Sequence, residues 1–191
     1  MQKIMLAHSV NIALQDEITQ RIISIQKELS IKHKELRFYD SSPHISILTK
    51  FMSPKLTEKF ATAIKDEFSN DKKWELKFSI FTKAEPSSYV FLNFSEETKN
   101  RIYELHNRAI KTTKDIGSLG QAGGLPKYQY NPHISIIKLD TNEVDEAFEF
   151  IHHKLDGISM PVDTYVITRE SLDNKGYGTF PIYSSIHLKP N

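Results

Sequence analysis

The chain has 191 residues, a formal net charge of +1 and no cysteine, and 39% of its residues are hydrophobic. The absence of cysteine excludes disulfides, thiolate metal sites and a cysteine nucleophile. Proteins that coat long nucleic acids usually carry a pronounced basic excess, and the balanced charge of this chain argues against that class. The composition is that of a globular protein, and its charge fits a small anionic ligand or the end of a short oligonucleotide.

The first half of the chain predicts alternating strands and helices. A short apolar strand begins at Val10 and leads into a helix with acidic residues in its first turn. The apolar side chains of this helix recur at helical spacing: Ile18, Ile22, Ile25 and Leu29. Residues 43–47, Pro-His-Ile-Ser-Ile, are typical of a strand. A second amphipathic helix follows, and then a strand at residues 74–81; the apolar stripe of this helix is Leu56, Phe60, Ile64 and Phe68.

The second half repeats this order. Its first strand begins at Val90, and Ser95 is a favourable N-cap for the helix that follows. That helix repeats the apolar register of its counterpart eighty residues earlier, with Ile102, Leu105 and Ala109. Pro-His-Ile-Ser-Ile returns at residues 132–136, eighty-nine residues after its first occurrence. The last helix and strands carry the stripe Val144, Phe148, Ile151 and Leu155 and the segments 161–168 and 183–188.

The difference between the two offsets falls in a Gly-rich segment at residues 117–128. This segment lacks the G-K-[ST] ending of a phosphate-binding P-loop. Two interpretations of it stay open. It is either a flexible surface connection or a mobile flap that covers the substrate and helps to select it.

A shared helix register together with an identical pentapeptide predicts a duplicated α+β fold. We expect one domain over residues 1–191, made of two βαβαβ-type halves at about 1–82 and 83–191. A pseudo-two-fold axis would relate the halves, with the helices outside and the strands forming a central groove. Chance similarity between two amphipathic segments explains the helix register but not the repeated pentapeptide.

The repeated pentapeptide is the strongest functional signal. Because side chains alternate along a strand, its isoleucines face the core, and His44 and Ser46 face the other way. His133 and Ser135 repeat this arrangement. Under a pseudo-two-fold, the two His/Ser pairs meet.

Two histidines and two hydroxyls at one place suit the cleavage of a phosphodiester. One imidazole deprotonates the attacking oxygen, and the other protonates the leaving oxygen. The serine hydroxyls donate to the non-bridging oxygens, where charge develops, and Lys50 and Lys138 add local positive charge. A single strand histidine is more often structural, so the duplication carries this interpretation. A metal site is disfavoured because zinc requires three or four protein ligands.

These motifs resemble the two-histidine (2H) phosphoesterase superfamily, in which His-x-(Ser/Thr)-x occurs twice in a duplicated α+β domain. The resemblance covers nearly the whole chain, from "IALQDEITQRI" to "SLDNKGYGTFPIYSSIHL". Within this superfamily, the sequence is similar to the bacterial 2′-5′ RNA ligase/cyclic phosphodiesterase branch and to the 2′-5′ oligoadenylate phosphodiesterase branch. The resemblance implies metal-independent chemistry without a cofactor, with His44 and His133 as the acid/base pair and Ser46 and Ser135 as phosphate-binding hydroxyls.

The resemblance also suggests where a nucleotide binds. Lys138 stands where the ligase-like branch often has a basic residue, and Phe180 stands near an aromatic residue of the closing strands that stacks on a base. Tyr177 competes with Phe180 for this role. Tyr130 precedes the second motif and either lines the groove or packs beside the strand.

The expected activity is hydrolysis of 2′,3′-cyclic phosphates or 2′-5′-linked oligonucleotides, with reversible RNA ligation as a related reaction. One alternative is an enzyme that destroys cyclic-oligonucleotide or oligoadenylate second messengers. An alternative of another class is a nucleotide- or RNA-binding module without turnover. The expected partner is a nucleotide or short oligonucleotide, and we expect a monomer.

The expected location is the cytoplasm. Residues 1–17 lack the apolar core of a signal peptide. No stretch approaches the roughly 18 apolar residues of a membrane span.

Overall fold

The computed structural model describes residues 5–32, 43–84, 89–119, 130–138, 143–152, 154–155, 157–170 and 181–190. In these ranges the helices are α1 (Asp16–Lys32), α2 (Thr57–Phe68), α3 (Glu96–Thr112) and α4 (Val144–Ile151). The strands are β1 (Leu6–Ile12), β2 (Ile45–Met52), β3 (Trp74–Ala84), β4 (Tyr89–Phe94), β5 (Ser118–Leu119), β6 (Ile134–Lys138), β7 (Ser159–Val162), β8 (Thr164–Arg169) and β9 (Ile182–His187).

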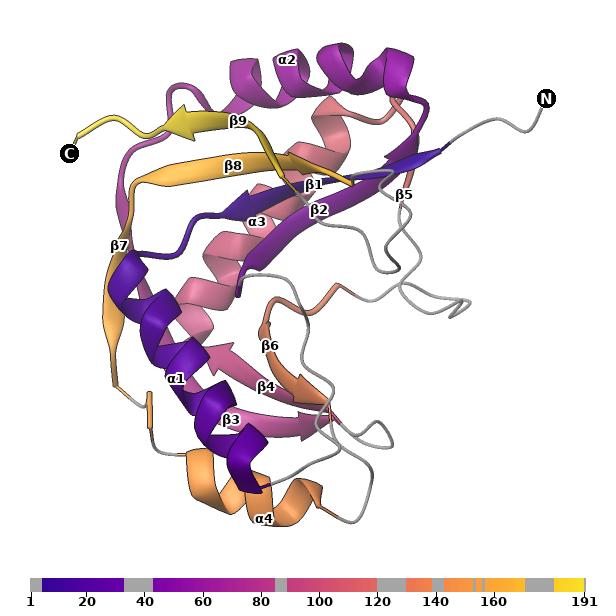
Figure 1. Ribbon diagram of the computed structural model, residues 1–191. Helices are drawn as coiled ribbons and strands as arrows, with labels where there is room; N and C mark the ends of the chain where they lie inside the picture. The colour runs from indigo at the N-terminus through magenta and orange to yellow at the C-terminus, as the bar shows by residue number, and fades with distance from the viewer. Residues whose placement is uncertain are drawn as a thin grey trace.

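The strands form two antiparallel sheets, in the orders β5-β2-β1-β8-β9 and β6-β4-β3-β7 (Figure 1). Each sheet mixes the two halves of the chain. The early strand β3 pairs with β4 and β7, and the late strand β8 pairs with β1. The predicted α+β class with duplicated halves is therefore confirmed, with the addition that the halves exchange strands.

The helices likewise pack on strands of the opposite half. Helix α3 of the second half packs on β2, and α1 of the first half lies beside β6 (Figure 1). The predicted strand at 161–168 is in fact two strands, β7 and β8, which belong to different sheets. The chain passes from one sheet to the other at Asp163, whose carbonyl accepts a hydrogen bond from the Leu188 amide at 2.8 Å.

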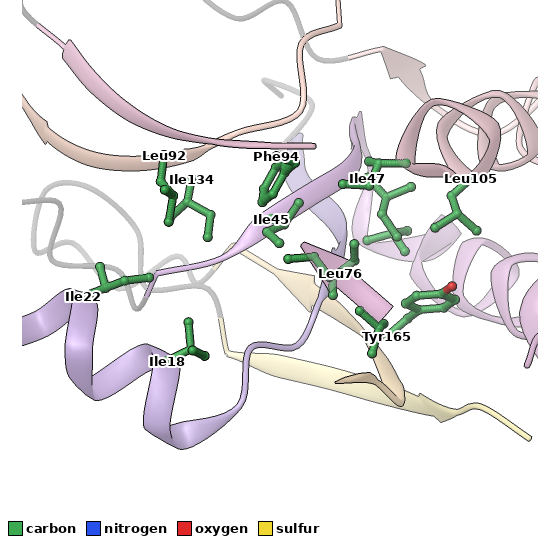
Figure 2. Packing of buried hydrophobic residues seen from close by; sticks show 14 of the residues in the cluster. Ile18, Ile22, Ile45, Ile47, Leu76, Leu92, Phe94, Leu105, Ile134 and Tyr165 are labelled. Atoms are coloured by element: carbon green, nitrogen blue, oxygen red, sulfur yellow. The ribbon is translucent and has the colours of Figure 1, made fainter. Parts of the chain in front are cut away.

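One hydrophobic core connects both sheets and their helices (Figure 2). Ile18 and Ile22 of α1 lie near Leu92 and Ile134 of the second sheet. On the other side of the core, Leu105 of α3 packs near β2. All of these side chains are buried and belong to one cluster, which both sheets share.

Both motif strands contain a β-bulge at the same point. On β2, Val10 pairs with Leu48 and Asn11 pairs with Ser46, which leaves Ile47 as an extra residue. On β6, Val90 pairs with Ile137 and Phe91 pairs with Ser135. The extra residue there is Ile136, the counterpart of Ile47. Each bulge places two successive residues in the core and reverses the alternation beyond it.

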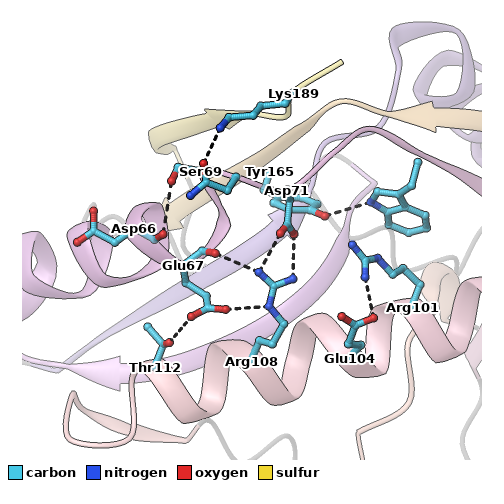
Figure 3. Close-up of polar contacts among 12 residues, drawn as sticks. Asp66, Glu67, Ser69, Asp71, Arg101, Glu104, Arg108, Thr112, Tyr165 and Lys189 are labelled. Atoms are coloured by element: carbon cyan, nitrogen blue, oxygen red, sulfur yellow. Dashed lines mark hydrogen bonds and ion pairs between the residues drawn. The ribbon is translucent and has the colours of Figure 1, made fainter. Parts of the chain in front are cut away.

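An ionic network holds α3 against the end of α2 (Figure 3). Arg108 donates to Glu67 at 2.8 Å and to both carboxylate oxygens of Asp71 at 2.8 and 3.1 Å. Thr112 donates to the second Glu67 oxygen at 2.8 Å. Burial alone would raise the pKa of Glu67, but the hydrogen bonds from Arg108 and Thr112 hold it below its usual value. The Asp71 side chain is only 9% exposed, and Arg108 supplies the charged donors that its carboxylate accepts from.

Replacing Arg108 by methionine is expected to lower the free energy of unfolding by about 2–3 kcal/mol, because it leaves buried Asp71 without its charged donor. Urea denaturation measures this change. Arg101→Met on the same helix is the matched control, since the bond from Arg101 to Glu104 is solvent-exposed and should cost about 0.5 kcal/mol or less. Equal losses in the two variants would contradict the role of the network.

Candidate active site

The first motif lies in a row of polar side chains on the first sheet. His44 is exposed just before β2, and Ser46 is partly buried on it. The Ser46 hydroxyl donates to Asn11 Oδ1 at 3.0 Å, and Asn11 Nδ2 donates to Thr168 Oγ1 at 3.1 Å. Three strands therefore hold one serine hydroxyl in place.

The second motif has a different environment. His133 is half-buried, and its Nδ1 lies 2.7 Å from the Asn131 carbonyl. The imidazole also packs on Phe91, with 4.1 Å between ring centroids. Ser135 lies two residues further along and is likewise partly buried. Because a carbonyl oxygen only accepts, Nδ1 carries the proton, and in the neutral ring Nε2 has the free lone pair.

The two motif histidines lie close enough to interact electrostatically. Burial lowers the pKa of His133 below 6.5, the Asn131 carbonyl opposes this, and the charge of His44 lowers the pKa further. A charge acts on its neighbour in this way only over a short distance. The structure thus brings together the two histidines that the sequence places eighty-nine residues apart.

The two halves of the site are not equivalent. Asn11 faces Ser46 across the first bulge, and Phe91 faces Ser135 across the second. These two residues occupy the same position of the repeat, eighty residues apart. One motif therefore has a hydrogen-bonding neighbour where the other has an aromatic ring.

The two candidate lysines are placed on opposite faces of their strands. The Lys138 amine lies 5.1 Å from the Tyr89 ring centroid, and that ring stacks on Phe91 at 5.8 Å. Lys138 is thus on the same side as the second motif. Lys50 is not at the site. It is 3% exposed, and its amine donates to the carbonyls of Thr113 and Ile116, the latter at 2.7 Å.

The bulge at Ile47 explains this correction. The expectation for Lys50 rested on its closeness to the first motif, and the extra residue at Ile47 turns the Lys50 side chain into the core. Burial lowers the pKa of the Lys50 amine, and Asp115 opposes this effect. Thr49 takes the place beside Ser46, and its hydroxyl lies 2.8 Å from that of Ser9.

The remaining candidates are aromatic. The Tyr130 hydroxyl donates to the Ser46 carbonyl at 2.6 Å, and its ring stacks on His106 at 3.8 Å. Tyr130 therefore packs beside the first motif, and its part in lining the groove stays a prediction. Tyr177, Phe180 and residues 120–128 of the Gly-rich segment lie outside the described residues.

Sequence reasoning missed Asn11, Thr168 and Phe91 as neighbours of the motifs. A signal for Asn11 existed, because Ser9 and Asn11 are alternate polar residues on either side of Val10. Thr168 had none, since only the pairing of β1 with β8 brings it there. For Phe91 the signal was the repeat itself, which aligns it with Asn11.

The described residues contain no group of three or more His, Asp or Glu residues that could hold a metal ion. Within the same ranges, no helix is long and apolar enough to span a membrane.

Comparison with known proteins identifies similar folds. A family model described as the 2′-5′ RNA ligase superfamily matches residues 14–174. LigT of E. coli in complex with 3′-AMP is 15% identical with a TM-score of 0.68, covering 97% of this chain and 99% of its own. TT0787 of Thermus thermophilus is 12% identical with a TM-score of 0.71, at 97% and 99% coverage.

A structure described only as a phosphoesterase is 15% identical with a TM-score of 0.69, covering 96% of this chain and 98% of its own. No curated protein matches the chain. At these identities the structural matches establish the shared fold and no more.

The proximity of the two histidines predicts a measurable coupling between them. His44→Ala should raise the pKa of His133, because it removes a neighbouring positive charge. NMR titration of the imidazole Cε1 protons measures this directly. His152→Ala is the control, since His152 lies on the exposed end of α4 with its Nδ1 2.9 Å from the Glu149 carbonyl. An unchanged pKa in His44→Ala would contradict the proximity.

Proposed function

The chain belongs to the 2′-5′ RNA ligase superfamily of 2H phosphoesterases, and from this membership we propose that it is a metal-independent phosphodiesterase. Its proposed substrates are 2′,3′-cyclic phosphates or 2′-5′-linked nucleotides, and His44 and His133 are the acid/base pair. The observation that supports the proposal is that each histidine is followed by a serine on an equivalent bulged strand, and that the charge of His44 lowers the pKa of His133.

We assign His133 as the base. Its Nδ1 is held by the Asn131 carbonyl, so Nε2 is the nitrogen that accepts a proton. Burial beside Phe91 favours the neutral ring that a base requires. In hydrolysis, a water oxygen attacks phosphorus while Nε2 of His133 takes a water proton. The bond from phosphorus to the ester oxygen breaks, and that oxygen takes a proton from His44.

The serines act on the non-bridging oxygens. Asn11 Oδ1 holds the Ser46 hydroxyl by accepting its hydrogen bond, and a phosphoryl oxygen would replace Asn11 as the acceptor. Ser135 has the corresponding place on β6. Lys138 adds positive charge near the second motif, where it attracts the phosphate. In ligation the chemical steps reverse, and the two histidines exchange roles.

Nucleotides are the proposed class of substrate. LigT of E. coli, which shares the fold, has been solved in complex with 3′-AMP, with ATP and with phosphate. The cleavage of cyclic or 2′-5′-linked nucleotides distinguishes this proposal from a module that only binds them. A panel of 2′,3′-cyclic nucleotides, 2′-5′ and 3′-5′ oligoadenylates and cyclic oligonucleotides, assayed in EDTA, identifies the substrate.

His44→Ala and His133→Ala should each lower kcat/KM by about 10²–10⁴, the usual contribution of a general acid or base. Ser46→Ala and Ser135→Ala should cost roughly tenfold or more. The measurement follows product release by chromatography in EDTA, which should leave the wild-type rate unchanged. His152→Ala should retain full activity. Unimpaired turnover in either motif-histidine variant would refute the mechanism.

The pH dependence should follow from the state of His133. Protonation of the base below its lowered pKa, which lies under 6.5, should produce the acid limb of a bell-shaped profile of kcat/KM. Phe91→Ala exposes His133 to water, which raises its pKa and should move this limb to higher pH. Phe148→Ala, which removes the ring stacked on His152, should leave the limb in place. A shift to lower pH in Phe91→Ala would contradict the assignment.

A further inference from the structure

The carbonyl of each bulged residue accepts a hydrogen bond from a helix side chain. His106 of α3 places Nδ1 2.7 Å from the Ile47 carbonyl. Gln26 of α1 places Nε2 2.8 Å from the Ile136 carbonyl. Both donors are nearly inaccessible, with His106 5% and Gln26 8% exposed. In a helix surface facing the core, such polar side chains need a specific reason to be there.

The two donors occupy the same position of the duplicated fold. The buried side chains of α1 are Ile18, Ile22, Ile25, Gln26 and Leu29. The buried side chains of α3 follow each of them by eighty residues: Thr98, Ile102, Leu105, His106 and Ala109. Their targets, Ile47 and Ile136, also correspond, at the offset of the repeated pentapeptide.

We infer that Gln26 and His106 are positioning residues that hold the bulges behind the two motif histidines, each supplied by the helix of the opposite half. This inference rests on the proposed function of His44 and His133. Neither residue touches the reacting atoms. Each acts through the carbonyl of a strand that carries the acid or the base.

The physical reason lies in the bulge. Its extra residue is left out of the strand ladder, so its buried carbonyl needs a partner from elsewhere. Without that partner, the strand would lose its bulge and straighten, so that the carbonyl regains a hydrogen bond within the sheet. A one-residue change of register would turn His44 and Ser46 away from their present face, because the apolar residues beyond the bulge stay anchored in the core.

Tyr130 strengthens this arrangement in the first half. Its hydroxyl donates to the Ser46 carbonyl, next to the carbonyl that His106 holds. The Tyr130 and His106 rings stack nearly parallel, at 7°. Tyr130 is also three residues before His133, so this contact links the first motif strand directly to the start of the second.

The test compares His106→Leu with His106→Asn. Both variants lose the ring and have nearly the same shape, but only asparagine keeps a donor at the position of Nδ1. His106→Leu should lower kcat by about 10–100-fold with KM changed less than about threefold, since misplaced catalytic groups reduce turnover more than binding. His106→Asn should recover kcat to within about threefold of wild type. Gln26→Met, which removes the donor on the other side, should behave as His106→Leu does.

A second readout does not need turnover. The effect of His44→Ala on the pKa of His133, measured by NMR, should fall by more than about half in the His106→Leu background and persist in His106→Asn. If the effect of His44→Ala on His133 persists in both backgrounds, the inference is wrong. If the effect is lost in both, the inference is also wrong, because the imidazole ring and not its hydrogen bond would then be responsible. If His106→Leu does not fold, the same comparison is made in Gln26→Met. A wild type that cleaves nothing refutes the proposed function but leaves this coupling test valid.

Discussion

The extra residue in each motif strand decides what the two strands present to the site and what they present to the core. Without the bulges at Ile47 and Ile136, residues 48 and 137 would leave the core and Lys50 would reach the surface. The bulges keep the histidine and serine on one face while both following residues stay buried. A strand of regular alternation cannot do both.

The exchange of elements between halves explains how the bulges are held. Because β3 and β8 cross to the opposite sheet, and α1 and α3 each cover the opposite motif strand, the contacts that shape one motif come from the other half. The core is continuous for the same reason. The relative placement of the two motifs therefore depends on packing across the whole fold, since β2 and β6 belong to different sheets of the described chain.

Much of the fold was predictable from the sequence. The repeated helix register and pentapeptide predicted the duplicated α+β fold, since both depend on local periodicity. The division of residues 161–168 at Asp163 was not predictable, because an extended segment that changes sheets has the same pattern as one that does not. The placement of Lys50 failed for a related reason: a bulge adds no recognisable residue type. The contact of Tyr130 with the Ser46 carbonyl was not predictable either, because it joins residues eighty-four positions apart.

The difference between Asn11 and Phe91 has a consequence for directionality. A phosphodiester is unsymmetrical, with one ester oxygen that leaves and another that stays. A site with strict two-fold symmetry would accept it equally well in two opposed orientations and would have no fixed acid or base. Under the proposed mechanism, the polar neighbour of one serine and the aromatic neighbour of one histidine would remove this degeneracy.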